Sequence, residues 1–336
     1  FVEEDAKLLI DSSNAEVDTL SQWPDSTRGS RGGSVSIPTT LQGLLTARLD
    51  RIGGDPIVVR SAAALGREFT HQMISLVCDL PQSTLEEELN KLVDSELLFR
   101  RGVGENCSYL FKHALIQDAA YDAMLRRQRQ EIQRRIADAL ETHFPETGQQ
   151  RPELLAHHRT EAGQHWPAVP LWEAAGTDAT DRGAFVEAVG HLLQAMASLE
   201  ASTMSGSNDF GEKDRLEQEY RINVPLGIAT LSLKGYAAPE LGAIYDRRME
   251  LCTILDDAMG QLHAKWAMGS WKIVRDEVEV CIQIGRDMMV MAEAMQDDGA
   301  RMEARFILAI GQFYHGEFEE CHKSCTEGMK LYEPER

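Results

Sequence analysis

The sequence predicts a mainly α-helical protein, in which a small domain with one short β-hairpin precedes a long series of paired helices. Two short segments, Leu98-Phe99-Arg100 and Tyr109-Leu110-Phe111, flank a turn that contains Gly102 and Gly104, a pattern typical of a hairpin. Beyond residue 112, apolar residues recur at helical spacing, and Gly or Pro stands at many of the breaks. We therefore expect no strand after the hairpin.

The composition is that of a soluble globular protein with two or three domains. The chain has 336 residues, of which 43% are hydrophobic and 26% are charged. The formal net charge of −20 argues against general affinity for nucleic acid or for anionic membranes, because phosphates would be repelled. No run approaches the roughly 18 apolar residues of a membrane span, and the N-terminus has no secretory leader. We expect a cytoplasmic protein that contacts no membrane.

The cysteines give no sign of a disulfide framework. The sequence contains six of them and no CxxC pair, and the last two are one helical turn apart. They are Cys78, Cys107, Cys252, Cys281, Cys321 and Cys325. Buried free thiols in a reducing compartment are the expected state.

Residues 1–36 predict a helix followed by a linker. The first ten residues have the pattern of a short amphipathic helix, and since the chain starts inside it at Phe1, we expect a fragment of a longer protein. Residues 11–36 are rich in Ser, Gly, Asp and Arg, as flexible linkers are. A second amphipathic helix is predicted over 40–52, where a glycine pair ends it.

Residues 37–125 predict a small domain of helices and the hairpin. Further helices are predicted over 56–65, from a cap at Thr70 to about Cys78, and from Ser83, which with Glu86 forms a capping box. Three or four helices and a hairpin in about 75 residues are the composition of a winged helix-turn-helix domain.

The segment 109–125 is predicted to be the seam between this domain and the helix series. It passes from the second strand into a helix over 113–125 with two neighbouring apolar faces. These faces carry Leu115, Ala119 and Ala123, and Ile116, Ala120 and Met124. A helix this apolar is expected to be buried on two sides.

Residues 126–336 predict a domain of helical repeats whose last repeat is cut at the C-terminus. From the seam onwards, helices are predicted over 113–125, 127–143, 152–164, 168–182, 185–200, 212–233, 238–256, 258–274, 277–295, 299–315 and 318–332. Small residues followed by an apolar helix recur in the same order around Gly176, Gly269 and Ala309. This order follows the tetratricopeptide scheme, in which small residues let one helix pack closely on the next. A generic helical bundle is the alternative, but the recurrence in three places favours an α-solenoid of tetratricopeptide-like pairs.

Six aromatic side chains are expected to fill the core between helices rather than to line a groove. They are Trp172, Phe185, Trp266, Trp271, Phe313 and Phe318.

The sequence assigns no catalytic, cofactor-binding or metal-ligating residue. It contains no G-x-x-x-x-G-K-[ST] phosphate loop, no G-x-G-x-x-G after a strand and no G-x-S-x-G elbow. The one local metal-type cluster is His157-His158 with Glu161 one turn later, but adjacent helical residues point about 100° apart and share an ion poorly. His113 is a candidate switch, although a structural histidine is favoured.

The charge pattern argues against direct DNA binding by the small domain. The candidate recognition helix, Ser83–Leu97, has a single Lys91, and its carboxylates would face phosphates in a major groove. Its acidic residues are Glu86, Glu87, Glu88, Asp94 and Glu96. The one basic cluster lacks interleaved aromatics and has Glu131 within it, so that a solvated or partner-facing surface is favoured. It consists of Arg126, Arg127, Arg129, Arg134 and Arg135.

Seven segments in this order resemble one protein family. They are SIPTTLQGLLTARLDRI (36–52), AAALGREF (62–69), LVDSELLFRRG (92–102), YLFKHALIQDAAYDAML (109–125), ELLAHHRTEAG (153–163), KGYAAPEL (234–241) and YHGEFEECHKSCTEGMKLYEPER (314–336). Together they are similar to the large bacterial signalling ATPases of the STAND class. In many of these proteins a class III adenylate or guanylate cyclase domain precedes the ATPase.

The resemblance implies a plan of an AAA-like ATPase module, a winged helix, and tetratricopeptide repeats that sense a partner. In this plan residues 1–10 resemble the segment that follows the ATPase core. ATP and Mg²⁺ would belong to the ATPase module, whose Walker A and Walker B segments are absent from this sequence. No catalytic residue of the family can therefore be placed here, and no cofactor is expected in this part.

The expected function is that of the regulatory and partner-sensing portion of such an ATPase, controlling an adenylate or guanylate cyclase output. This portion is not expected to be an enzyme. The winged helix would pack on the ATPase module, and the repeats would bind a protein or a small ligand in their groove. Two alternatives remain: a transcriptional activator whose DNA-binding domain lies outside this sequence, and a free-standing repeat adaptor.

Overall fold

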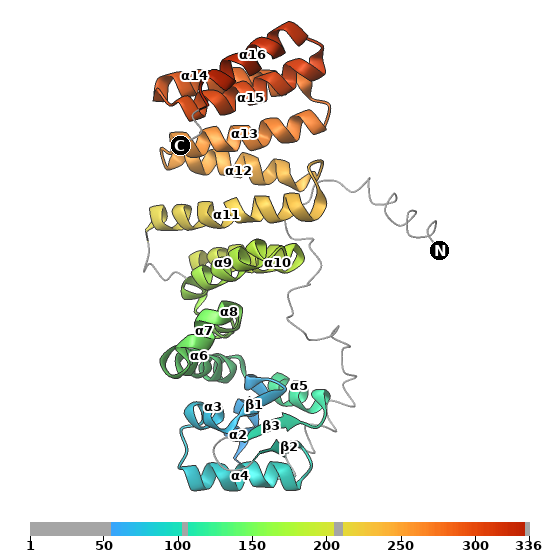
Figure 1. The fold of residues 1–336 in the computed structure, drawn as a ribbon. Helices are drawn as coiled ribbons and strands as arrows, with labels where there is room; N and C mark the ends of the chain where they lie inside the picture. Colours follow the sequence, from blue (N-terminus) through green and yellow to red (C-terminus); the bar gives the residue numbers. More distant parts are fainter. Residues whose placement is uncertain (1–54, 103–106, 205–210, 333–336) are drawn as a thin grey trace, which may run out of the picture. The chain divides into compact units, whose positions relative to one another are not determined.

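The computed structural model describes residues 55–102, 107–204 and 211–332, and its elements are labelled as in Figure 1. The chain divides into two units, Phe1–Val35 and Ser36–Arg336. The helices and the linker that the sequence predicts before residue 55 lie outside the described part, as does Gly104 of the predicted hairpin turn.

The N-terminal described part alternates helices and short strands. Helix α2 (Pro56–Leu65) begins after Asp55, whose side chain accepts a hydrogen bond from the backbone N–H of Ile57. Strand β1 (Glu68–Thr70) leads into α3 (His71–Val77), which Thr70 caps as predicted by accepting from the backbone N–H of Met73. Helix α4 (Gln82–Asp94) follows.

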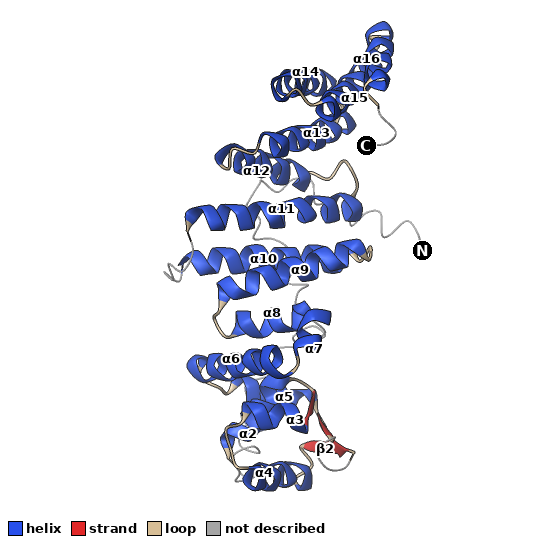
Figure 2. Ribbon diagram, turned by 60° about the vertical axis from the view of Figure 1, so that its left-hand side comes forward, coloured by secondary structure: helices blue, strands red, loops and turns tan. Residues whose placement is uncertain are grey.

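The strands form one small antiparallel sheet, drawn in red in Figure 2. Strands β2 (Leu98–Arg101) and β3 (Ser108–Phe111) confirm the predicted hairpin, with Leu98 opposite Phe111. The order is β1-β3-β2, so the last strand lies between the other two. The sequence analysis did not predict β1, because so short a segment is too brief to establish an alternating pattern.

The predicted start of α4 is wrong. The helix begins at Gln82 after Pro81, so that Ser83 is already inside the first turn and no side-chain cap bond forms. Within the acidic run of this helix, Glu88 is buried. Its carboxylate accepts hydrogen bonds from the backbone N–H of Asp55 at 2.7 Å and from the Lys91 ammonium at 2.6 Å. These bonds hold the pKa of Glu88 below its usual value, chiefly through Lys91.

The seam helix α5 (Ala114–Asp122) is buried along one predicted face and part of the other. Ile116, Ala119, Ala120 and Met124 are buried, whereas Leu115 and Ala123 are exposed. The predicted burial on two sides is therefore too broad, because an apolar side chain on a helix does not by itself require a covering partner.

Eleven further helices follow α5 within the described residues, and each helix predicted beyond residue 112 is confirmed. They are α6 (Arg126–His143), α7 (Pro145–Gln150), α8 (Pro152–Glu161), α9 (His165–Asp181), α10 (Phe185–Met204), α11 (Glu212–Lys234), α12 (Glu240–Ile254), α13 (Ala258–Val274), α14 (Val278–Met295), α15 (Asp298–His315) and α16 (Phe318–Lys330). The short α7 was not predicted. From α8 onwards, each helix packs against the next one in sequence. None of the described helices is both long enough and apolar enough to cross a bilayer.

The turns of the series recur at a constant interval. A residue with positive φ stands between helices at Asp256, Asp276, Gln296 and Gly316, and the step along the chain from each to the next is the same. From α13 onwards, the pair of helices is therefore a regular repeat. The first turn of successive pairs is capped in the same way, since Asp257 and Asp297 each accept a backbone hydrogen bond of 2.8 Å. Gly269 and Ala309, which the sequence pattern places at equivalent positions, are separated by the same interval as Asp257 and Asp297.

Small residues set the distance between neighbouring helices. A Cβ atom on Gly176 of α9 would lie 2.5 Å from Cγ of Leu192 in α10. A Cβ atom on Gly285 of α14 would lie 2.9 Å from the backbone N of Leu308 in α15. Both distances are shorter than real Cβ contacts, so these helices can approach only because glycine stands there.

The hydrophobic core of the sheet-containing part continues into the helix series. One cluster of buried side chains includes Phe69 and Phe111 from the sheet, Ile136 from α6 and Leu155 from α8. Packing therefore extends across residue 125, the domain boundary predicted from the sequence. A separate cluster joins α13, α14 and α15.

Candidate ligand-binding site

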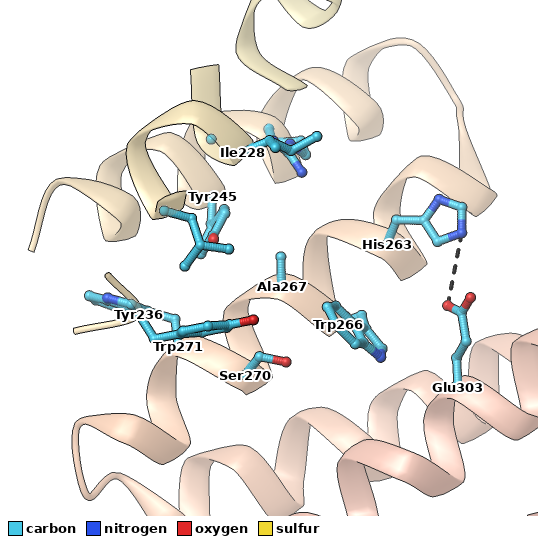
Figure 3. Close-up of a pocket in the computed structure, with 12 residues that line it drawn as sticks. Ile228, Tyr236, Tyr245, His263, Trp266, Ala267, Ser270, Trp271 and Glu303 are labelled. Atoms are coloured by element: carbon cyan, nitrogen blue, oxygen red, sulfur yellow. Dashed lines mark ion pairs between the residues drawn. The ribbon is translucent and has the colours of Figure 1, made fainter. Parts of the chain in front are cut away.

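A pocket of about 350 Å³ lies between helices α11, α12 and α13, and Glu303 of α15 lies at one end (Figure 3). Aromatic side chains contribute much of its wall: Tyr236, Tyr245, Trp266 and Trp271. Figure 3 shows Trp266, Ala267, Ser270 and Trp271 along α13, with Ile228 and Tyr245 on the opposite side. A concave, mostly apolar space with a few polar groups is the usual form of a small-molecule site.

A buried guanidinium faces this pocket. Arg248 of α12 is only 8% exposed, and it is held by neutral acceptors of α11. Its Nε donates to Oδ1 of Asn223 at 3.1 Å, and its Nη2 donates to the backbone oxygens of Asn223 at 3.1 Å and Val224 at 3.2 Å. Burial lowers the pKa of Arg248 from its ordinary value, but a guanidinium keeps its charge in proteins.

Gly227 of α11 leaves room for the Arg248 guanidinium. A Cβ atom on Gly227 of α11 would lie 2.7 Å from Nη2 of Arg248. A side chain at residue 227 would therefore push the guanidinium away from its present place against α11. The Tyr245 ring lies beside it, with 5.7 Å between the ring centroid and Cζ of Arg248.

The aromatic wall is fixed by contacts outside the pocket. Nε1 of Trp271 donates to the backbone oxygen of Ala238 at 3.0 Å. A Cβ on Gly242 of α12 would lie 2.6 Å from Cη2 of Trp271, so the indole wedges against the helix backbone. Trp266 stacks on Phe306 of α15 with 6.2 Å between ring centroids. The two indoles are therefore placed by packing before any ligand arrives.

The opposite end of the pocket carries one carboxylate, from Glu303, and one imidazole, from His263. Nε2 of His263 lies 3.9 Å from Oε2 of Glu303, the pair marked by the dashed line in Figure 3. This Oε2 is buried and accepts no hydrogen bond among the described residues. A donor group of a ligand would find an acceptor there.

The sequence analysis did not find this site. Arg248 continues the apolar stripe of α12, in which Ile244, Leu251 and Cys252 are buried on the same face. An arginine in an apolar stripe was the available signal. The assembly of that arginine with the indoles of the next helix depends on packing that no local pattern contains.

A second polar cluster lies at the predicted seam. Nδ1 of His158 in α8 donates to Oε1 of Gln133 in α6 at 2.6 Å. Nε2 of Gln133 donates to the Tyr121 hydroxyl at 3.0 Å, and that hydroxyl donates to Oε2 of Glu161 at 2.8 Å. This seam network joins α5, α6 and α8. Burial lowers the pKa of His158 to about 3, with a smaller contribution from His157, so the imidazole is neutral.

The residues considered as metal ligands belong to this seam network. His158 is buried in it, Glu161 accepts from Tyr121, and His157 is exposed on the neighbouring face. Within the described ranges, no group of three or more His, Cys, Asp or Glu is placed to hold a metal ion. His113, the other candidate, is the N-cap residue of α5 and makes no side-chain cap bond.

The charged surfaces considered for nucleic acid are largely paired or acidic. On α4, Glu86, Glu87 and Asp94 are exposed or partly exposed. In the arginine cluster, Arg134 pairs with Glu131 and Asp138, while the Arg129 guanidinium lies 4.3 Å from the Tyr121 ring centroid. The nearby carboxylates thus neutralise part of this basic surface.

The prediction that six aromatics fill the core is correct for some and wrong for others. Trp172 is buried and Phe185 is half-buried. Trp266 and Trp271 are half-buried but line the pocket between α11, α12 and α13, so the prediction is wrong for these two. Phe313 and Phe318 are 54% and 62% exposed, although their rings contact each other at 5.8 Å between centroids. Phe313 lies near the end of α15 and Phe318 begins α16, so the expectation of burial is wrong for both.

The cysteines divide in a similar way. Cys78, Cys107, Cys252 and Cys281 are buried free thiols, as expected. Cys325 is exposed and Cys321 is partly exposed, so the expectation of burial is wrong for this pair. Both lie on α16, whose outer side has no covering helix in the described part of the chain.

Comparison with known proteins gives limited information. No family model matches the chain. It is similar, at 25% identity over 329 residues, to an uncharacterized protein of Rhizobium meliloti (strain 1021). The match covers 95% of this chain and 31% of that protein, so the chain spans about a third of its relative's length.

Proposed function

We propose that this chain is the regulatory and ligand-sensing portion of a cytoplasmic signalling ATPase of the STAND class. In this proposal the paired helices bind a small ligand or a protein partner, and the binding controls a nucleotide-dependent output such as an adenylate or guanylate cyclase. The observation that carries it is the pocket between α11, α12 and α13, where the helices hold the buried guanidinium of Arg248 and fixed aromatic side chains. Rigid helices that position such a site suit recognition.

The order of elements supports a winged-helix assignment for the N-terminal described part. Helix α2, strand β1, helices α3 and α4, and strands β2 and β3 follow one another, with the sheet order β1-β3-β2. Its helix α4 exposes Glu86 and Glu87, and such a face is repelled by phosphates. We therefore propose that this domain packs on a nucleotide-binding module of the same protein and does not bind DNA.

The helix pairs support a tetratricopeptide-like assignment with a longer period. Glycines at the helix contacts, such as Gly176 and Gly285, correspond to the small residues that such repeats need. The interval from the turn at Asp256 to the turn at Gln296 is longer than the tetratricopeptide unit, which usually has about 34 residues. The extra length falls in the helices, which gives each pair a wider surface for a ligand.

Catalysis is assigned in this proposal to other parts of the protein. The described residues supply a binding pocket and a packed scaffold, and the ATP and Mg²⁺ of the proposal belong to an ATPase module outside this sequence. The relative of which this chain covers 31% leaves room for further domains of that size.

The open reading frame that contains this chain tests the proposal. We expect a G-x-x-x-x-G-K-[ST] segment within roughly 250–350 residues upstream of Phe1, a span of one or two domains. A cyclase domain before it would identify the output. A start codon close to Phe1 with no phosphate loop would contradict the ATPase proposal and leave a repeat adaptor. A helix-turn-helix domain encoded after Arg336 would favour the transcriptional activator.

A further inference from the structure

We propose that the pocket between α11, α12 and α13 binds a small organic acid. Its carboxylate pairs with the guanidinium of Arg248, and its flat apolar body lies among the surrounding aromatic side chains. The inference rests on the proposed sensing function and names the chemical class of the ligand.

Arg248 has no counterion among the described residues. Buried charges in proteins are usually paired with an opposite charge, because desolvation of a lone ion costs several kcal/mol. Arg248 forms no ion pair within the residues that the structure describes, and all its acceptors are neutral oxygens of Asn223 and Val224. An anion in the pocket would supply the charge that the fold leaves out.

The guanidinium of Arg248 also has hydrogen-bond donors left for a ligand. A guanidinium has five N–H donors, and the bonds to α11 use only Nε and Nη2. The two N–H groups of Nη1 have no acceptor in the described chain, and Arg248 lines the pocket. Carboxylates accept such donors in short, charge-assisted hydrogen bonds. The bonds to α11 fix the guanidinium in place, so a ligand need not order it.

The remaining space of the pocket has the size and the walls of a site for a flat apolar body. About 350 Å³ lies within the range of small-molecule pockets and is too small for a folded segment of a partner protein. Trp266 and Trp271 are held by Phe306 and Ala238, so they offer rigid flat surfaces. A planar apolar body stacks on such surfaces at low entropic cost.

The far end of the pocket limits the ligand to one acidic group. Glu303 presents a buried carboxylate oxygen there, beside His263. A second carboxylate at that end would face a like charge, whereas a hydroxyl or amine would donate to it. We therefore expect monocarboxylic acids to bind better than dicarboxylic acids.

The test is calorimetric titration of the 336-residue chain with naphthalene-2-carboxylate and with naphthalene-2-carboxamide. The two probes share the same ring system and differ in the charge of one group. We expect the carboxylate to bind ten- to a hundredfold more tightly than the amide, as a charge-assisted hydrogen bond would give. Equal affinity of the two probes, or no binding of either at millimolar concentration, would overturn the inference.

Three variants locate the effect. In Arg248→Met the carboxylate should lose at least tenfold in affinity, while the amide changes little. Arg286→Met is the matched control, because Arg286 is exposed on α14 and lies outside the pocket; its affinity for the carboxylate should equal that of the wild type. Ala267→Phe fills the space beside Trp266 and should abolish binding of both probes. An unchanged preference for the carboxylate in Arg248→Met would place the charge recognition elsewhere and overturn the inference.

The outcome does not depend on whether Arg248→Met folds. Arg248 also ties α12 to α11, so circular dichroism must first show wild-type helix content. If it does not, the wild-type preference for the carboxylate and its loss in Ala267→Phe decide the question. Binding is measured without any nucleotide, so a positive result here with no effect on nucleotide turnover would contradict the proposed function alone.

Discussion

His158 and Arg248 are both more than nine-tenths buried, but one side chain is neutral and the other is positively charged. His158 is neutral, because burial lowers its pKa to about 3, and it donates one hydrogen bond to Gln133. Arg248 stays charged among neutral oxygens, because a guanidinium does not release its proton at accessible pH. The first residue makes stability depend on pH, and the second provides a fixed positive charge for recognition.

The seam network predicts acid sensitivity in a definite window. Since the pKa of His158 falls from 6.5 to about 3 on folding, the unfolded chain binds a proton below pH 6.5 that the folded chain does not bind. This contribution to stability is complete above pH 6.5 and is lost as pH falls. The free energy of unfolding, measured with urea, should therefore fall by about 1.4 kcal/mol per pH unit between pH 6 and 5.

Replacement of the two adjacent histidines separates this effect from general acid denaturation. His158→Gln keeps a hydrogen-bonding side chain but cannot titrate, so most of the slope between pH 6 and 5 should disappear. His157→Gln, on the exposed neighbour, should keep the slope. His165, whose pKa is also lowered by burial, contributes a remainder common to both variants. An unchanged slope in His158→Gln would show that the imidazole does not carry it.

At the scale of the elements, glycine contacts decide how closely the helices pack. A Cβ on Gly285 would lie 2.9 Å from the backbone N of Leu308 and 3.1 Å from its Cα, and backbone atoms cannot move aside as a side chain can. Gly285→Ala should therefore lower the free energy of unfolding by about 1–3 kcal/mol, as overpacking does. Urea titration followed by circular dichroism measures this change.

Gly148 in α7 provides the matched control for that substitution. A Cβ there would lie 3.6 Å from the side chain of Leu155, an ordinary contact. Gly148→Ala should be neutral or stabilise by up to about 1 kcal/mol, because alanine favours the helix and restricts the unfolded chain. If both variants lose the same stability, the close approach of α14 to α15 is not the cause.

The sequence was sufficient for the helices and insufficient for the finer elements. Helix ends carried their own signals, such as Asp297 as a cap and Gly316 at a positive φ. Strand β1 is very short and becomes a strand only because β3 pairs with it, as Tyr109 does with Phe69. Ser83 had a capping pattern, but the helix had already begun at Gln82. Local chemistry thus predicts boundaries, and long-range pairing decides the exceptions.

At the scale of the whole molecule, the pocket was the part that sequence reasoning could not reach. It needs Gly227 to make space, Arg248 to carry charge and Trp271 to form a wall, and these residues come from three helices. In the sequence each belongs to a different helix, and only Arg248, an arginine in an apolar stripe, departs from the ordinary pattern. Only the packing of the three helices brings these residues together in one pocket. The net charge of −20 argues against nucleic acid and anionic membranes as partners, but it gives no location for a binding site.

The most direct measurement is ATP hydrolysis by the protein of the complete open reading frame, titrated with naphthalene-2-carboxylate. We expect the rate to change with a half-effect at the affinity found by calorimetry, and we expect Arg248→Met to lose this response while Arg286→Met keeps it. A hydrolysis rate that is independent of the acid in every variant, with binding intact, would contradict the claim that the helix series controls nucleotide turnover.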